Sequence, residues 1–276
     1  MSIDPEKDGA KMNFDGKMSY GDYLCLDNIL NSQIVRSSAH DEMLFIIQHQ
    51  TSELWLKLAL HELDGARLAI KSDNLQKSFK MLSRVTRIFE QLNNAWDVLR
   101  TMTPSEYTEF RDKLGQSSGF QSYQYRLIEF VVGNRNSAMI KPHKHKPEIL
   151  EKLMYELSCP SIYDEALHLL KRSGIDVSNE VLERDYSKTH KPHPSVVAAW
   201  KIIYTEPTKY WPLYELAEKL TDFEDYFRRW RFNHVTTVER IIGFKRGTGG
   251  TSGTHYLRQM LNIELFPELW HVRTEL

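Results

Sequence analysis

The chain has 276 residues, of which 41% are hydrophobic and 26% charged, and its formal net charge is −1. This near-neutral charge gives no electrostatic basis for binding nucleic acid or an anionic membrane. Cys25 and Cys159 stand in no metal or redox spacing, and the first residues are polar and acidic. We therefore expect a cytoplasmic protein with neither a disulfide framework nor a signal peptide.

Helical periodicity runs through nearly all of the patterned sequence, and no convincing stretch alternates as a β-strand does. The amphipathic segments that predict helices are 40–71, 74–100, 103–115, 120–132 and 208–243. The first is apolar on two faces, which is typical of a helix in the middle of a bundle. Pro212 is expected to bend the first turns of the last. We expect an all-α protein with a flexible segment over residues 1–17 and a single large helical bundle-type domain over 18–276.

The helix predicted over residues 103–115 has clear limits. A capping box with proline at the first helical position starts it and a glycine ends it, namely Thr103-Pro104-Ser105-Glu106 and Gly115. Within it, Tyr107, Arg111 and Leu114 share one face. An arginine facing the core beside a tyrosine can clamp a carboxylate, whereas a surface arginine is the commoner case. Both interpretations of Arg111 stay open at this point.

Glycines are concentrated directly after the last predicted helix. Four of the chain's 13 glycines fall between positions 247 and 253. Glycine is dense where a backbone takes positive φ or approaches something closely, so this loop is predicted to wrap around a ligand. A Walker loop is excluded because Thr254 and His255 follow where a lysine and a hydroxyl residue are needed. A Rossmann fingerprint is excluded because Ser252 takes the position of its third glycine and the preceding segment is helical.

Two histidines lie on apolar faces of the predicted central helices. His234 falls on a stripe with Trp230 and Val238, and His49 is flanked by Phe45. Such a histidine is most often a core residue that is hydrogen-bonded to a neighbour. The alternative is a large apolar cofactor such as haem, with one imidazole as axial ligand and the other on the distal side.

Other metal sites are poorly supported by the residue spacing. Glu53 lies one turn after His49, but a zinc or non-haem iron site would need a third ligand that the sequence does not place nearby. His143 and His145 stand in a short basic run without a neighbouring carboxylate or cysteine. We interpret that run as a solvated loop.

A set of specific segments carries a family resemblance. The segments are Tyr20–Leu24, His40–Trp55, Thr103–Tyr107 with Phe110-Arg111, Ser118–Ser122, Arg231–His234, Gly243–Gly250 and Phe266–Leu269. With them the chain resembles the tryptophan 2,3-dioxygenase family from about residue 18 to residue 274. Gln116 stands where many relatives have proline, and the chain ends soon after Thr274. Neither departure removes a residue that the resemblance assigns to the site.

The resemblance implies an all-helical homotetramer, a dimer of dimers, with long central helices that enclose one haem b per subunit. It also implies an activity. Both atoms of O₂ enter the C2–C3 bond of the indole of L-tryptophan, giving N-formyl-L-kynurenine, in the first step of the kynurenine pathway of tryptophan degradation. His49 is implied to act at the distal side by hydrogen-bonding the indole N–H, and the carboxylate of the substrate is implied to pair with Arg111.

The resemblance also assigns the other positions. Residues implied to line the substrate pocket are Phe45, His49, Tyr107, Arg111, Leu114, Ser118 and Thr248. Residues implied to reach it from the neighbouring subunit are Tyr20, Tyr23 and Leu24. Residues implied to contact the haem are Ser118, Gly119 and the proximal ligand His234. From the position of the glycine loop after His234 and beside Arg111, we predict a lid that is mobile without tryptophan and ordered with it, formed by Gly247, Thr248, Gly249 and Gly250.

Four alternatives remain to be weighed against this function. They are a helical interaction scaffold, a nucleotide-dependent enzyme that uses the glycine loop, a haem-binding sensor without turnover, and an indoleamine dioxygenase with relaxed substrate choice. The absent lysine and strand count against the nucleotide enzyme. Arg111, Tyr107 and the N-terminal segment disfavour the indoleamine dioxygenase.

Overall fold

The computed structural model describes residues 4–276, so the first three residues of the expected segment 1–17 lie outside it. Every regular element in this range is a helix, which confirms the all-α expectation. The α-helices are α1 (Tyr20–Leu24), α2 (Leu26–Leu30), α3 (Asp41–Lys71), α4 (Leu75–Leu99), α5 (Pro104–Arg111), α6 (Tyr123–Val131), α7 (Pro147–Ser158), α8 (Ile162–Arg172), α9 (Asn179–Leu182), α10 (Pro194–Thr205), α11 (Trp211–Ile242), α12 (Thr254–Met260) and α13 (Pro267–His271). The 3₁₀ helices are η1 (Pro5–Asp8), η2 (Asp112–Leu114), η3 (Gly119–Gln121), η4 (Ser137–His143) and η5 (Val272–Thr274). None of the helices described is long and apolar enough to cross a membrane.

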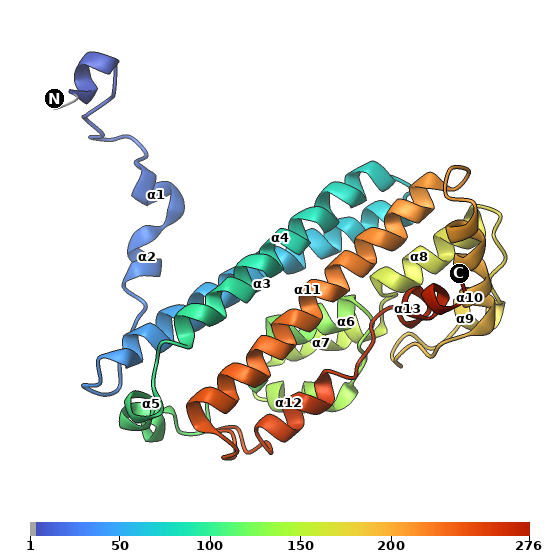
Figure 1. Ribbon diagram of the computed structural model, residues 1–276. Helices are drawn as coiled ribbons and strands as arrows, with labels where there is room; N and C mark the ends of the chain where they lie inside the picture. Colours follow the sequence, from blue (N-terminus) through green and yellow to red (C-terminus); the bar gives the residue numbers. More distant parts are fainter. Residues whose placement is uncertain (1–3) are drawn as a thin grey trace.

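Three long helices form the frame of the molecule. In Figure 1, α3, α4 and α11 run along the length of the body, and α4 packs against both of the others. Their shared faces hold an aromatic core in which the rings of Phe89, Phe223 and Phe227 lie 5.2–5.6 Å apart between centroids. Full burial of each such ring contributes roughly 1.5–3 kcal/mol to folding.

The body has two different ends (Figure 1). At one end, which we call the site end, lie α5, α12 and the loop that joins α11 to α12. At the other, which we call the C-terminal end, lie α8, α10 and α13 beside the C-terminus. The long helices connect the two ends, so each end is built on the same rigid scaffold.

Two boundaries test the sequence interpretation directly. The capping box at Thr103 is present, with both reciprocal hydrogen bonds to Glu106, and Gly115 follows η2 with φ of +58°. The predicted bend at Pro212 is wrong. Helix α11 begins at Trp211, so Pro212 lies in the first turn, where a missing backbone N–H removes no intrahelical hydrogen bond.

The N-terminal arm, residues 4–38, leads away from the body in Figure 1. Neither α1 nor α2 buries a residue. The arm joins α3 at a fixed point, because the buried Glu42 carboxylate accepts hydrogen bonds from the backbone N–H groups of Arg36 (2.8 Å) and Ser37 (2.7 Å). The arm therefore presents its side chains to surfaces other than the core of its own chain.

Two fully buried carboxylates hold the C-terminal end together. Glu224 of α11 accepts hydrogen bonds from the backbone N–H groups of Leu265 (2.7 Å) and Phe266 (3.0 Å) and from Trp270 Nε1 (2.8 Å). Glu268 of α13 has three partners of its own, which are the ring Nε2 of His190 (2.6 Å), the backbone N–H of His193 (2.9 Å) and the hydroxyl of Tyr163 (2.9 Å). The segment after α12 is thus fastened to α8, α10 and α11.

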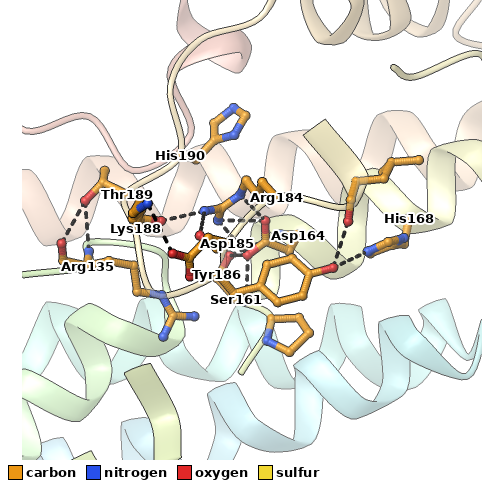
Figure 2. Close-up of polar contacts among 12 residues, drawn as sticks. Arg135, Ser161, Asp164, His168, Arg184, Asp185, Tyr186, Lys188, Thr189 and His190 are labelled. Carbon is orange, nitrogen blue, oxygen red and sulfur yellow. Dashed lines mark hydrogen bonds and ion pairs between the residues drawn. The ribbon is translucent and has the colours of Figure 1, made fainter. Parts of the chain in front are cut away.

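The loop before α10 is fixed in the same way (Figure 2). The Arg184 guanidinium donates from Nε and Nη2 to the buried Asp164 carboxylate, both at 2.9 Å. Tyr186 accepts from His168 Nε2 at 3.0 Å and donates to a backbone carbonyl, and the Thr189 hydroxyl bonds the backbone of Arg135. These pairs leave the loop little freedom.

Candidate active site

His49 lies on α3 at the site end, with its ring against Phe45 at 4.1 Å between centroids. Its Nδ1 is 2.7 Å from the backbone carbonyl oxygen of Phe45. A carbonyl can only accept, so Nδ1 carries the proton and Nε2 of the neutral ring is left as an acceptor. Burial lowers the pKa of His49 below its ordinary value of 6.5 and keeps the ring neutral. The site thus contains an imidazole acceptor with a fixed tautomer.

His234 lies on α11 and has a different environment. Its ring is stacked on Trp96 of α4, with centroids 5.0 Å apart and planes at 15°. No side chain or backbone group of residues 4–276 hydrogen-bonds this ring. Burial, with a smaller contribution from the nearby His49, lowers the pKa of His234 to about 4. A neutral imidazole without a hydrogen-bonding partner has a lone pair free to coordinate a metal.

An aromatic wall adjoins His49. The Phe45 ring lies 5.5 Å from Phe110 and 6.0 Å from Tyr107 between centroids, and Leu114 packs against the same cluster. Tyr107 and Phe110 come from α5 and Leu114 from η2, so the capping box of α5 sets where this wall stands. Such a wall can hold a flat apolar ligand beside the acceptor nitrogen of His49.

Arg111 ends α5 next to this wall. Its Nη2 donates to the backbone carbonyl of Arg246 at 2.9 Å, and its buried Nε has no partner among the residues described. Burial raises the pKa of Tyr107, and the neighbouring Arg111 guanidinium opposes that rise. A charged group held only by a neutral carbonyl retains the capacity to bind an anion.

The glycine loop lies against the loop before η3. Thr248 Oγ1 donates to the backbone carbonyl of Ser117 at 2.6 Å. A Cβ on Gly249 would lie 2.9 Å from the Cβ of Ser118, and one on Gly253 would lie 2.5 Å from the carbonyl oxygen of Lys245. These two close approaches require glycine, as the sequence predicts. The contacts place the loop over the region of Ser118 and Arg111.

The predicted residues fall into two groups. Those that contacts bring together at the site end are Phe45, His49, Tyr107, Arg111, Leu114, Ser118, Gly119, His234, Gly247, Thr248, Gly249 and Gly250. Those on the arm, away from this end of the same chain, are Tyr20, Tyr23 and Leu24. The tyrosine side chains on the arm are largely exposed, each at 75%.

A buried charged cluster beneath the site was missed by the sequence analysis. Arg126 and Arg231 both pair with the Glu129 carboxylate, Arg231 at 3.0 Å, and all three residues are almost fully buried. Two guanidinium groups sharing one carboxylate leave an excess positive charge, and Nε of Arg126 has no partner among the residues described. The available signal was a charged pair three residues apart within the otherwise apolar segment of α6. This cluster suits a carboxylate of a bound ligand.

These observations test which metal group the residues fit. In the described part of the chain no three His, Cys, Asp or Glu side chains converge, so a metal held by protein side chains alone has no ligand set here. A haem brings four ring nitrogens of its own and needs one axial donor from the protein. His234 is a suitable donor, and the positive cluster around Arg126 suits the carboxylates of the macrocycle. The residues present fit a haem.

Comparison with known proteins agrees with this geometry. The family model described as tryptophan 2,3-dioxygenase matches residues 5–202 and 201–276. A tryptophan 2,3-dioxygenase of Bradyrhizobium sp. (strain BTAi1) is 66% identical over 99% of this chain and 98% of its own length. The tryptophan 2,3-dioxygenase of Bradyrhizobium diazoefficiens is 65% identical over 98% of this chain and 97% of its own length. That of Ruegeria pomeroyi is 61% identical over 100% of this chain and 99% of its own length. The chain belongs to the tryptophan 2,3-dioxygenase family.

Proposed function

We propose that this protein is a dioxygenase that uses one haem b per subunit to convert L-tryptophan and O₂ into N-formyl-L-kynurenine. The observation that carries the proposal is that two imidazoles, His49 on α3 and His234 on α11, lie near one another and are kept neutral by burial. Beside them, the buried Nε of Arg111 has no hydrogen-bonding partner among the residues described. One imidazole is free to ligate a metal, the second is free to accept a hydrogen bond, and the arginine is free to bind a carboxylate.

His234 would ligate the haem iron, Ser118 and Gly119 would contact the group, and the positive cluster around Arg126 would pair with its carboxylates. When bound, this group supplies the oxygen chemistry that amino-acid side chains cannot perform. The protein's own part is to orient the substrate and to exclude water from the site.

His49 would position the indole. Its Nε2 is the acceptor nitrogen because Nδ1 is bonded to the carbonyl of Phe45, and it would receive the indole N–H. Indole N–H is a weak acid, so His49 acts here as a hydrogen-bond acceptor and does not remove the proton. Phe45 and Leu114 would form a wall of the indole pocket. If His49→Ala abolished turnover while leaving tryptophan affinity and the haem spectrum intact, this role would be wrong.

Arg111 would bind the substrate carboxylate with help from Tyr107. Without substrate its Nη2 donates to the neutral carbonyl of Arg246, which lies in the glycine loop. A carboxylate makes a charge-assisted and bidentate pair that is stronger than a bond to a neutral carbonyl. The substrate would therefore displace this carbonyl, and the glycine loop, with Thr248 contacting the amino-acid end, would close over it as a lid.

The N-terminal arm would complete the site of a neighbouring subunit in a homotetramer, a dimer of dimers. The arm carries large exposed side chains with no place in the core of its own chain, including Met18, Tyr20, Tyr23, Leu30 and Ile34. Surface of this kind is typical of a segment that packs on a partner. Removal of residues 4–30 should leave the helical body folded, reduce the oligomer measured by light scattering, and weaken tryptophan binding.

The direct test supplies haem during expression and follows product formation from L-tryptophan under ¹⁸O₂ with a reductant. We expect a coloured protein and N-formyl-L-kynurenine in which both added oxygen atoms are labelled. A colourless protein without product would overturn the proposal. A coloured protein that binds tryptophan without turnover would favour a haem sensor, and equal rates with decarboxylated analogues would favour an indoleamine dioxygenase.

A further inference from the structure

Trp96 is the side chain most closely fitted to His234. It comes from α4, which carries none of the residues that the sequence analysis assigned to the site. Its indole lies nearly parallel to the imidazole, with planes at 15° and centroids 5.0 Å apart. Trp230, one turn before His234 on α11, lies 5.7 Å from both rings at angles near 47°. The imidazole thus contacts two indoles from two helices, and the three rings form one cluster.

This arrangement differs from the usual support of a metal-binding histidine. Such a histidine almost always donates its second ring N–H to a carboxylate, a carbonyl or water, and that bond fixes the plane of the ring. The His234 ring makes no hydrogen bond with any of residues 4–276. The flat stack on Trp96 is the contact that can fix its plane.

Polar pairs between α4 and α11 hold the stack in register. Asn233 Nδ2 donates to Asn93 Oδ1 at 2.9 Å, and Asn93 lies one turn before Trp96. Arg100, one turn after Trp96, donates from Nε to the Thr237 hydroxyl at 2.8 Å. The stack is therefore clamped on both sides along the helix axis, and α4 and α11 cannot slide past one another without breaking these pairs.

The indole nitrogen of Trp96 supplies a second, independent argument. Its Nε1 is buried and has no partner among the residues described. A buried unpaired donor costs roughly 1–3 kcal/mol of stability, which a phenylalanine at this position would not incur. Stability alone would favour phenylalanine at this position. The advantage of tryptophan therefore lies in the large face that its indole presents to the imidazole.

We propose that Trp96 is a positioning residue for the axial imidazole, setting the plane of the His234 ring by face-to-face stacking in place of a hydrogen bond. This inference rests on the proposed function, in which His234 ligates the haem iron. In this role Trp96 acts only through His234. The polar pairs of Asn93 and Arg100 maintain the geometry that makes this possible.

The test uses the haem-loaded protein and compares Trp96→Leu with Trp96→Phe, with Trp211→Leu as control. Trp211 lies on the same helix as His234 but is 56% exposed and distant from the site. The first readout is the iron–histidine stretching band in the resonance Raman spectrum of the ferrous protein. The second is the rate at which haem transfers to excess apomyoglobin. Neither readout depends on turnover.

We expect Trp96→Leu to shift and broaden the band and to speed haem loss about tenfold, because the stacking face is removed. Trp96→Phe should show a smaller change in both, with no loss of stability in the haem-free chain, since the unpaired N–H is gone. Trp211→Leu should match the wild type. A wild-type band and wild-type haem loss in Trp96→Leu would overturn the inference.

A second variant protects the test against a folding defect in Trp96→Leu. Arg100→Gln leaves both rings in place but removes the ionic donor that joins α4 to Thr237. It should broaden the same band by a smaller amount, and an unchanged band would count against the clamp. If the wild type lacks the band, or if His234→Ala keeps it, the proposed function fails. If the wild type shows the band but Trp96→Leu leaves it unchanged, only this inference is overturned.

Discussion

The two ends of the helical body treat buried polar groups in opposite ways. At the C-terminal end, the carboxylates of Glu224 and Glu268 each receive three hydrogen bonds. At the site end and beneath it, buried donors are left without partners. Of the seven buried side-chain atoms without a hydrogen bond in the described part of the chain, four lie there, on Trp96, Arg111, Arg126 and His143, whereas one, Arg135 Nε, lies beside the loop before α10. His143 is only 4% exposed, so the expectation of a solvated loop was wrong at this residue.

The difference separates residues that fasten the fold from residues that serve ligand binding, either directly or, for Trp96, through His234. A buried polar group that is fully paired stabilises a unique packing, whereas an unpaired one carries a desolvation cost with no return in the unliganded chain. Proteins tolerate such a cost where a ligand will later supply the missing partner. Substitutions at the C-terminal end should therefore change stability, and substitutions at the site end should change ligand binding and activity.

The largest expected effect is that of His234→Ala. This variant should lose the bond between the protein and the haem iron, and with it product formation. The free energy of unfolding of the haem-free chain should fall only by the lost packing of the ring on Trp96 and Trp230, because the imidazole has no hydrogen-bonding partner. The matched control is His190→Ala, which takes a donor from Glu268. It should lower stability by roughly 1–3 kcal/mol and keep haem and activity. Haem titration and chemical denaturation measure both, and identical behaviour of the two variants would break the comparison.

Glu224→Ala should give the largest loss of stability. It leaves two backbone N–H groups and the Trp270 indole N–H without an acceptor, for an expected loss of about 3–5 kcal/mol in the free energy of unfolding. Glu224→Gln keeps one acceptor oxygen and should lose less. Activity per folded, haem-loaded molecule should match the wild type in both. A variant of normal stability but reduced activity would contradict the separation of the two ends.

Arg111→Ala should lower kcat/KM for L-tryptophan by a factor of about 30 to 1,000, equivalent to roughly 2–4 kcal/mol for a charged pair in a buried site. Stability should change little, because Arg111 makes one hydrogen bond to a carbonyl in the structure. Arg111→Lys should recover part of the loss. Binding of an analogue without the carboxylate serves as the control, and equal weakening of both ligands would argue against the carboxylate clamp.

The smallest effect concerns pH. Because burial lowers the pKa of His49, the unfolded chain binds this proton more tightly than the folded one. The resulting cost is absent above the ordinary pKa of 6.5 and grows as the pH falls from there to the lowered value. The slope of unfolding free energy against pH in this window should be shallower in His49→Gln. The acid limb of kcat/KM should also lie below pH 6.5 in the wild type, and a limb at or above 6.5 would contradict a neutral acceptor.

Local patterns were sufficient to predict α3, α4, α5, α6 and α11 and several site residues, but not the shorter helices α7, α8 and α10. The capping box at Thr103 and the close approach of Gly253 to Lys245 follow from short-range chemistry that a sequence displays directly. The stripe that carries His234 follows from helical periodicity. The family resemblance, and not any spacing, supplied the roles of Arg111 and Thr248.

Contacts between distant segments were out of reach of this reasoning. Trp96 fits the amphipathic pattern of its helix as an ordinary core residue, and nothing local indicates that it stacks on a ring 138 positions later. The cluster in which Arg126 and Arg231 share the Glu129 carboxylate was missed for the same reason, because it forms only when α6 and α11 come together. The error at Pro212 was one of boundary, because the helix starts three residues later than its apolar pattern predicts.

Hydrogen exchange measured by mass spectrometry tests the central claim most directly. The haem-free chain, the haem-loaded chain and the haem-loaded chain with L-tryptophan would be compared. We predict that residues 111–121 and 243–260 gain protection stepwise with each ligand, while residues 186–200 and 262–273 at the C-terminal end are already protected and do not change. Equal changes at both ends, or none at the site end, would contradict the division of the molecule into a fastened end and an end completed by its ligands.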